Sequence, residues 1–278
     1  MPNHHGWATA LLNGFSQVVL QRHPLCGLCC LLAILISAPT LLGGALLGAA
    51  SGLLTAHRRG YLQAHRQAGL FSYNGVLIGL LLSQWLPSNL TLPLLIIAAS
   101  GLSTLLMGQW LKFGVRATCL PAYTAPFVMT GWAAAYLLEP SPHAEHAFAA
   151  ADALTGLGQI FLLGNPMAGA LILLGVWLAD RRAALWALFG SLMGLTFAAW
   201  QGEPSLPGLY GCNPALAALA FSRQPLRALV AVGLAVLLQP GFTGLALPPL
   251  TAPFILACWL VRASVRVLPL EAALHSRR

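Results

Sequence analysis

Long apolar runs separated by short polar stretches repeat along the whole chain of 278 residues. A membrane-crossing helix needs about 20 mostly apolar residues, and most of these runs have that length. The pattern therefore predicts an all-α membrane protein with ten crossings. We place the crossings at residues 10–37, 39–56, 68–86, 90–107, 118–138, 153–179, 183–200, 207–222, 225–240 and 248–262.

The composition agrees with this prediction. Hydrophobic residues make up 58% of the chain and charged residues only 7%, whereas soluble proteins carry about 25% charged residues. We therefore expect an integral membrane protein without a separate soluble domain. The net charge of +8 does not indicate nucleic acid binding, because the single lysine and nearly all of the 13 arginines lie in short loops or near the C-terminus.

The positions of the basic residues predict the orientation in the membrane. Apart from Arg22, every Lys and Arg falls on alternate loops, and almost all acidic residues fall on the others. Basic loops face the cytoplasm in most membrane proteins. The pattern predicts an inner (plasma) membrane protein with both termini in the cytoplasm.

Two crossings are unusual because glycine and asparagine interrupt them. The stretch "GLFSYNGVLIG" lies in the crossing at 68–86, and "PGLYGCNPALAALAF" lies in the crossing at 207–222. Broken backbone at membrane depth must face protein or a water-filled cavity, because lipid cannot satisfy its hydrogen bonds. We expect each crossing to be an extended segment followed by a tilted half-helix.

Three motifs occur twice, in the same order in each half of the chain. "FSQVVLQRHPLCGL" resembles "LGQIFLLGNPMAGA", "LFSYNGVL" resembles "LYGCNPAL", and "LPAYTAPF" matches "LPPLTAPF" at six of eight positions. The duplication predicts two repeats, at residues 1–145 and 146–278. Five crossings in each would invert the second repeat relative to the first, a plan that places a permeation site at the centre of the membrane.

The polar residues at the repeated positions are neutral. They are the pairs Gln17 and Gln159, Asn74 and Asn213, and Thr124 and Thr251. No Asp, Glu or Lys lies within an apolar crossing, although coupled transporters usually need buried ionisable groups. Passive movement of a neutral polar solute fits best. Each amide could instead join two helices, each Thr could cap a helix, and each Asn could satisfy loose backbone.

Other functions find less support in the sequence. An ammonia channel would need paired histidines within the membrane, and the eight histidines lie in loops or at the ends of crossings. An active transporter would need a buried carboxylate. A membrane-embedded enzyme would need a nucleophile, an acid pair or a metal cluster in the membrane. We expect no enzyme, no cofactor and no metal site.

The doubled motifs resemble those of the urea transporters over residues 13 to 260. The resemblance implies passive, channel-like transport of urea, with a homotrimer and one pore in each protomer. It also implies an amide at each outer site, threonines in the middle, and apolar side chains that form a flat slot for planar urea.

Carried onto this sequence by the motifs, the resemblance assigns twelve pore residues. The amides are Gln17 and Gln159, and the middle threonines are Thr124 and Thr251. Each half-helix contributes an asparagine and two slot residues, and the first helices contribute slot partners. These are Asn74, Tyr73 and Leu77, then Asn213, Cys212 and Leu216, with Leu20 and Ile160 as partners. Cys212 stands where an aromatic residue is usual, so ammonia or a small amide is the alternative solute.

Overall fold

The computed structural model describes residues 4–113, 120–138, 152–202, 207–243 and 248–275, and its regular elements there are all helical. This confirms the predicted all-α class. The elements are α1 (His4–Val18), α2 (Pro24–Ser37), α3 (Pro39–Arg58), α4 (Gln63–Gln67), α5 (Tyr73–Trp85), α6 (Thr91–Phe113), α7 (Ala125–Leu138), α8 (Asp152–Gly158), η1 (Gln159–Phe161), α9 (Pro166–Ala179), α10 (Arg181–Gln201), α11 (Pro207–Ala220), α12 (Pro225–Thr243) and α13 (Ala252–His275).

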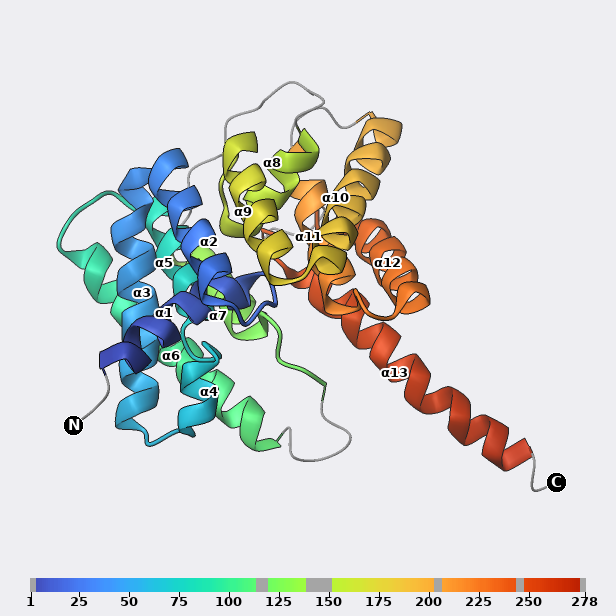
Figure 1. Cartoon of the computed structure of the whole chain (residues 1–278), viewed down its shortest axis with the longest axis horizontal. Helices are drawn as coiled ribbons and strands as arrows, with labels where there is room; N and C mark the ends of the chain where they lie inside the picture. Colours follow the sequence, from blue (N-terminus) through green and yellow to red (C-terminus); the bar gives the residue numbers. More distant parts are fainter. Residues whose placement is uncertain (1–3, 114–119, 139–151, 203–206, 244–247, 276–278) are drawn as a thin grey trace.

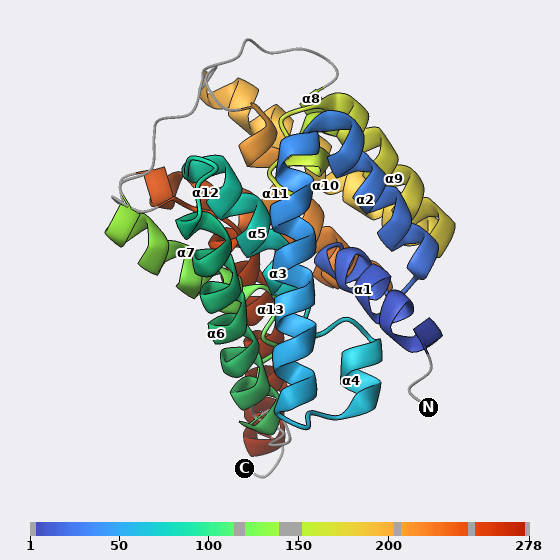
Figure 2. The same cartoon turned by 90° about the vertical axis from the view of Figure 1, so that its left-hand side faces the viewer.

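The helices form two groups side by side. Helices α1–α6 lie in one group and α8–α12 in the other (Figure 1). Helix α2 packs against α9 across the boundary, and α13 contacts α7, α11 and α12. In Figure 2, α3 runs down the middle of the face turned toward the viewer, with α5 and α6 beside it. The predicted boundary between the repeats, at residues 145 and 146, lies outside the described residues.

Four described helices are long and apolar enough to cross a membrane, namely α3, α6, α10 and α12. The expected crossing at 153–179 is instead a pair of helices that meet at 79°. The expected crossing at 10–37 is likewise two helices, α1 and α2, separated by residues 19–23. Neither stretch is the single helix that the hydropathy pattern predicted, because proline begins the second helix in both places.

The two interruptions share one backbone design. Leu20 and Leu162 occupy corresponding positions and have left-handed φ angles of 57° and 58°. Each chain segment then turns into a helix with proline in its first turn, where a missing N–H is no cost. His23 caps α2 through Nδ1, and Asn165 caps α9 through its side-chain oxygen, 2.8 Å from the Met167 N–H. Two sequences with different caps therefore share the same left-handed residue and the same proline at the start of the next helix.

The prediction of an extended segment before each half-helix was wrong. Residues 68–72 form turns, and α11 is helical from Pro207 through the "YGCNP" stretch to Ala220. Pro214 lies inside that helix and has no N–H to donate to the carbonyl of Tyr210 four residues earlier. Helices α5 and α11 have 13 and 14 residues. At 1.5 Å per residue both are about 20 Å long, shorter than the roughly 30 Å hydrocarbon core.

Close backbone contact fixes α5 against α3. A Cβ added to Gly48 would lie 2.0 Å from the Gly75 carbonyl oxygen, and one added to Gly75 would lie 2.2 Å from the Gly48 oxygen. The other group of helices has the same contact, where a Cβ on Gly194 would lie 2.0 Å from the Tyr210 oxygen. Small residues at helix interfaces are how apolar helices approach each other closely in a membrane.

We expect Gly48→Ala to destabilise the protein by about 1 to 3 kcal/mol, because the new methyl group meets backbone that cannot move aside. Gly43→Ala is the matched control in the same helix, since a Cβ there meets nothing within 4 Å. The control should leave the melting temperature of the purified protein unchanged or raise it slightly. Equal melting temperatures for the two variants would contradict the close contact.

Candidate functional site

The predicted amides lie at corresponding interruptions of the two helix groups. Gln17 is in the last turn of α1, and Gln159 begins η1. The carbonyl of Gln17 accepts from the Leu20 N–H at 3.0 Å, and that of Gln159 accepts from the Leu162 N–H at 2.9 Å. Both side chains are partly exposed, and within the described residues neither amide group has a hydrogen-bond partner. Both amides therefore keep a donor and an acceptor that the described protein groups do not use.

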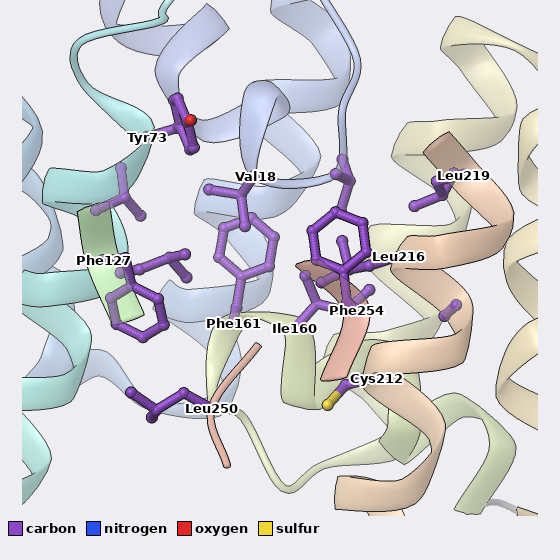
Figure 3. Packing of buried hydrophobic residues seen from close by; sticks show 14 of the residues in the cluster. Val18, Tyr73, Phe127, Ile160, Phe161, Cys212, Leu216, Leu219, Leu250 and Phe254 are labelled. Atoms are coloured by element: carbon purple, nitrogen blue, oxygen red, sulfur yellow. The ribbon is translucent and has the colours of Figure 1, made fainter. Parts of the chain in front are cut away.

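Leu20 and Ile160, the predicted slot partners, do not correspond to each other. The matched left-handed positions pair Leu20 with Leu162, so the counterpart of Ile160 is Val18. Ile160 and Val18 are both buried, whereas Leu20 is half-buried. Figure 3 shows Val18, Ile160, Phe161 and Phe254 in one apolar group. Sequence reasoning missed Phe161 and Phe254, although both belong to the repeated motifs.

The two threonines meet at the boundary between the helix groups. The hydroxyls of Thr124 and Thr251 are 2.8 Å apart and buried. Each threonine follows a residue with positive φ, Tyr123 at 44° and Leu250 at 46°, and each precedes the first residue of its helix. A threonine in that position often caps the third helical N–H with its hydroxyl. Here the hydroxyls bond to each other instead.

The asparagines explain why the threonine hydroxyls are free to do so. Asn74 Oδ1 accepts from the Phe127 N–H at 3.3 Å, and Asn213 Oδ1 accepts from the Phe254 N–H at 3.1 Å. These N–H groups belong to the third residues of α7 and α13. Leaving either N–H unpaired in the interior would cost stability. The structure thus assigns both asparagines to the backbone, the alternative that the sequence left open.

The repeated "TAPF" sequence satisfies the remaining donors at both helix starts. The alanine N–H groups of Ala125 and Ala252 donate to carbonyls three residues earlier, at 2.9 and 3.0 Å. The prolines that follow have no N–H to satisfy. The N–H of the fourth residue in each helix donates to the threonine carbonyl. Every donor at these two buried helix starts is therefore paired or absent.

The slot residues of the half-helices are buried but differ in their polar contacts. Tyr73, Leu77, Cys212 and Leu216 all belong to the core, and Figure 3 shows Tyr73 and Cys212 on opposite sides of the apolar group. The Tyr73 hydroxyl donates to the Tyr123 carbonyl. Cys212 is its counterpart, and its sulfur accepts from Asn213 Nδ2 at 3.7 Å.

Asn213 takes over that task in the second helix group. Its Nδ2 donates to the Leu250 carbonyl at 3.0 Å and to the Gln239 side-chain oxygen at 3.0 Å. Gln239 is almost fully buried in α12 and was not predicted as a site residue. The carbonyl before each middle threonine is therefore bound in both groups, by a tyrosine in one and an asparagine in the other.

Two tryptophans that sequence reasoning missed, one in α7 and one in α13, make reciprocal contacts with the segments before those helices. Trp132 Nε1 donates to the Pro248 carbonyl, and Trp259 Nε1 donates to the Pro121 carbonyl, both at 2.8 Å. The donors correspond to each other, as do the acceptors, since each tryptophan follows its motif threonine by the same interval. Such an exchange of identical contacts is typical of two units related by a two-fold axis. The equal spacing was the signal available in the sequence.

Arg262 is a charged residue close to these contacts. Its Nε donates to the Tyr123 hydroxyl at 3.0 Å, and its guanidinium lies 5.3 Å from the centre of the Phe221 ring. Tyr123 also packs edge-on against Phe254. The arginine therefore holds the ring that adjoins the apolar group. The sequence placed Arg262 only in a basic tail.

These features define an all-α membrane protein with interrupted helices. Its two similar halves meet through neutral polar and apolar residues. Comparison with models of known families matches residues 8–265 to the urea transporter family. The chain therefore belongs to the urea transporter family. Membership in a family of transporters confirms that the chain is an integral membrane protein and not an enzyme.

Individual relatives agree with this assignment. Urea transporter 1 of Mus musculus is 28% identical over 252 residues, and those of Rattus norvegicus and Ovis aries are 27% identical over 251 and 26% over 239. In each case the match covers 76% of this chain and 62% of the relative. The chain thus spans about 62% of the length of these relatives.

We expect Asn213→Leu to destabilise the protein more than Asn74→Leu. Leucine keeps the size, but at position 213 it leaves the Phe254 N–H, the Leu250 carbonyl and the Gln239 oxygen unpaired. At position 74 the corresponding loss is the bond to the Phe127 N–H. The free energy of unfolding should fall by about 3 kcal/mol for Asn213→Leu and about 1 kcal/mol for Asn74→Leu. Thermal unfolding of the purified variants measures both, and equal losses would contradict this division of roles.

Proposed function

We propose that this protein conducts urea passively, down its gradient, through a pore within each protomer. The observation that carries the proposal is the pair of amides, Gln17 and Gln159, at corresponding helix interruptions. They are partly exposed and have no hydrogen-bond partner among the described residues. In contrast, Asn74 and Asn213 are buried and bonded to backbone. The two glutamines are therefore the polar groups best placed to receive a solute.

The chemistry of urea fits this arrangement. Urea is planar and neutral, with four N–H donors and one carbonyl acceptor, and a glutamine amide can both accept from it and donate to it. A donor left unpaired on entering a narrow pore would cost about 1 to 3 kcal/mol. Apolar walls near Ile160, Phe161 and Leu216 favour a flat neutral molecule. They exclude ions, whose dehydration costs far more.

The contacts of Asp180 support passive transport. The Asp180 side chain caps the start of α10. Its Oδ2 lies 3.6 Å from the Nη2 of Arg223. It is therefore bound to structure and does not offer a buried proton or cation site of the kind that coupled transport needs. A solute gradient alone would drive the flux.

The contacts between the helix groups support two inverted repeats of five crossings, residues 1–145 and 146–278, around this pore. The reciprocal tryptophan bonds, the threonine pair and the matched left-handed residues are what a two-fold axis through the threonines would produce. Five crossings per repeat would place that axis in the membrane plane. We propose Thr124 and Thr251 as the middle of the pathway, with the glutamines toward its two mouths.

The remaining assignments rest on the family and on the distribution of charge. The basic loops support an inner (plasma) membrane protein with cytoplasmic termini. Membership in the urea transporter family supports a homotrimer surrounded by membrane lipid. Tyr73, Leu77, Cys212, Leu216 and Ile160 are proposed to form the slot, and Val18 replaces Leu20 as the counterpart of Ile160.

Cys212 favours a second candidate solute. It is smaller than Tyr73 at the corresponding position and makes that side of the slot less aromatic. A small amide or ammonia could then also pass. Stopped-flow light scattering of proteoliposomes with urea, acetamide and ammonia gradients distinguishes the candidates by their relative permeabilities.

We expect Gln17→Leu and Gln159→Leu each to lower urea permeability by roughly 5- to 150-fold, equivalent to about 1 to 3 kcal/mol for one unmade hydrogen bond. Leucine keeps the size of the side chain and removes its polar atoms. Stopped-flow light scattering gives the flux per reconstituted protein, and thermal unfolding gives the stability of the same samples.

Gln109→Leu is the control for this pair, because Gln109 is exposed on α6 and far along the chain from either motif. It should leave the flux unchanged. If the glutamines only joined helices, their variants would lose stability while keeping the flux per folded protein. Unchanged flux in both pore variants would end the assignment.

We expect urea flux into proteoliposomes to be the same with and without an imposed sodium or proton gradient. The physical reason is that Asp180 already binds the N–H of Arg182 and the side chain of Arg223, and so is not available to a coupling ion. Radiolabelled urea uptake measures the effect, and an ionophore serves as the control. Accumulation of urea above its outside concentration, driven by either ion, would refute passive transport.

A further inference from the structure

A polar cavity lies between α1, α3 and α4, and none of its lining residues is among the proposed pore residues. Its volume is about 600 Å³. Figure 2 shows α4 beside one end of α3, with α1 next to it. The lining residues that carry the argument are Trp7, Asn13, Arg22, His57, Gln63 and Arg66. We call this space the α1–α4 pocket.

The α1–α4 pocket carries positive charge without a compensating acid. Arg22 and Arg66 line it, and its described lining contains no Asp or Glu. Arg66 Nη1 contacts His57 Nδ1. Because a guanidinium can only donate, His57 accepts in this contact and does not neutralise the arginine. Two arginine charges are therefore left for a ligand.

Two buried polar atoms of the pocket residues have no partner among the described residues. One is the Arg66 Nε donor and the other is the Asn13 Oδ1 acceptor. The Asn13 side chain is held in place by its Nδ2, which donates to the Gln67 carbonyl at 2.7 Å. A ligand that satisfies both atoms must accept hydrogen bonds strongly and must also carry a donor of its own.

The position of the pocket points to the level of the lipid headgroups. Trp7 lies at its edge, 37% exposed, with its ring against His57. Tryptophan is enriched where the membrane meets water. The exposed Arg58 and Arg59 follow directly at the end of α3. Basic pockets between helices at this depth are suited to phosphate headgroups.

We propose that the α1–α4 pocket binds a phosphate group that also bears a hydroxyl, such as an anionic phosphatidylglycerol headgroup. The phosphate oxygens would accept from Arg22 and from the Nε of Arg66, and a hydroxyl would donate to Asn13 Oδ1. Arginine is well matched to phosphate, because its planar donors form paired, charge-assisted bonds. Protonated inorganic phosphate has the same chemistry and is the soluble alternative source. The residues that would bind the phosphate are not among the proposed pore residues.

The test is a thermal unfolding titration of the purified full-length protein in neutral detergent. One arm adds phosphatidylglycerol to mixed micelles of the detergent and phosphatidylcholine, and another adds inorganic phosphate at constant ionic strength. A ligand that binds the folded state raises the melting temperature as its concentration rises. We expect stabilisation by phosphatidylglycerol over phosphatidylcholine alone. Stabilisation by inorganic phosphate without an effect of phosphatidylglycerol would assign the site to a soluble phosphate.

The double variant Arg22→Gln and Arg66→Gln should raise the apparent dissociation constant for phosphatidylglycerol by roughly tenfold or more, because charge-assisted hydrogen bonds are lost. The matched control is Arg181→Gln with Arg182→Gln, which removes the same charge from exposed residues at the start of α10. The control should keep the wild-type response.

Gln63→Glu covers the case in which the double variant does not fold. Gln63 is exposed at the rim of the pocket in α4, so glutamate adds a repelling charge there without removing a core contact. It should also weaken binding. A wild-type response in Gln63→Glu, an equal loss in the α10 control, or no stabilisation of the wild type by either ligand would overturn the proposal.

Discussion

The structure depends on one constraint: a helix that begins inside a membrane exposes N–H groups that lipid cannot bind. Helices α7 and α13 both begin among buried residues, and their first donors are all accounted for. A proline removes one donor, nearby carbonyls take two, and an asparagine from α5 or α11 takes the last. This requirement places the asparagine of one helix next to the start of another, and so sets how the half-helices pack against α7 and α13.

Once the asparagines fulfil that requirement, other polar groups become available. The hydroxyls of Thr124 and Thr251 do not have to cap their own helices and instead meet across the boundary. The indole N–H groups of the two tryptophans donate to the proline carbonyls of the opposite motif. Contacts between the helix groups are thus made by side chains that the local backbone does not need. This is consistent with two-fold packing of the proposed repeats.

Sequence reasoning recovered the features that local patterns determine. Helical class follows from hydropathy, and the buried contacts of Asn74 and Thr124 occur at positions that the duplication singles out. It failed where backbone geometry decides the outcome. The bends after Val18 and Phe161 are invisible to a hydropathy count, because the residues remain apolar through both bends.

Leu20 and Ile160, the predicted slot partners, occupy different positions of the repeated motif, and the backbone there shows why position matters. Left-handed φ angles at Leu20 and Leu162 turn the chain, so neighbouring side chains leave it in different directions. The register of the motif is then the reliable guide to equivalent positions. The tryptophan pair was accessible in principle, since both follow their threonines at one interval. Arg262 was not, because its contact with Tyr123 joins segments 139 residues apart in the chain.

Comparison of the amides shows how a polar residue in such a protein can be assigned to structure or to transport. Asn213 uses its donor and its acceptor on protein groups, and replacing it would strand all of them. Gln17 and Gln159 lie at helix interruptions where nearby backbone N–H groups already bond to carbonyls of the same turn. Their side chains are not needed by that backbone. A partly exposed amide in a membrane protein still gains from a partner, so the proposed role of these two glutamines follows from the hydrogen bonds that the fold does not require of them.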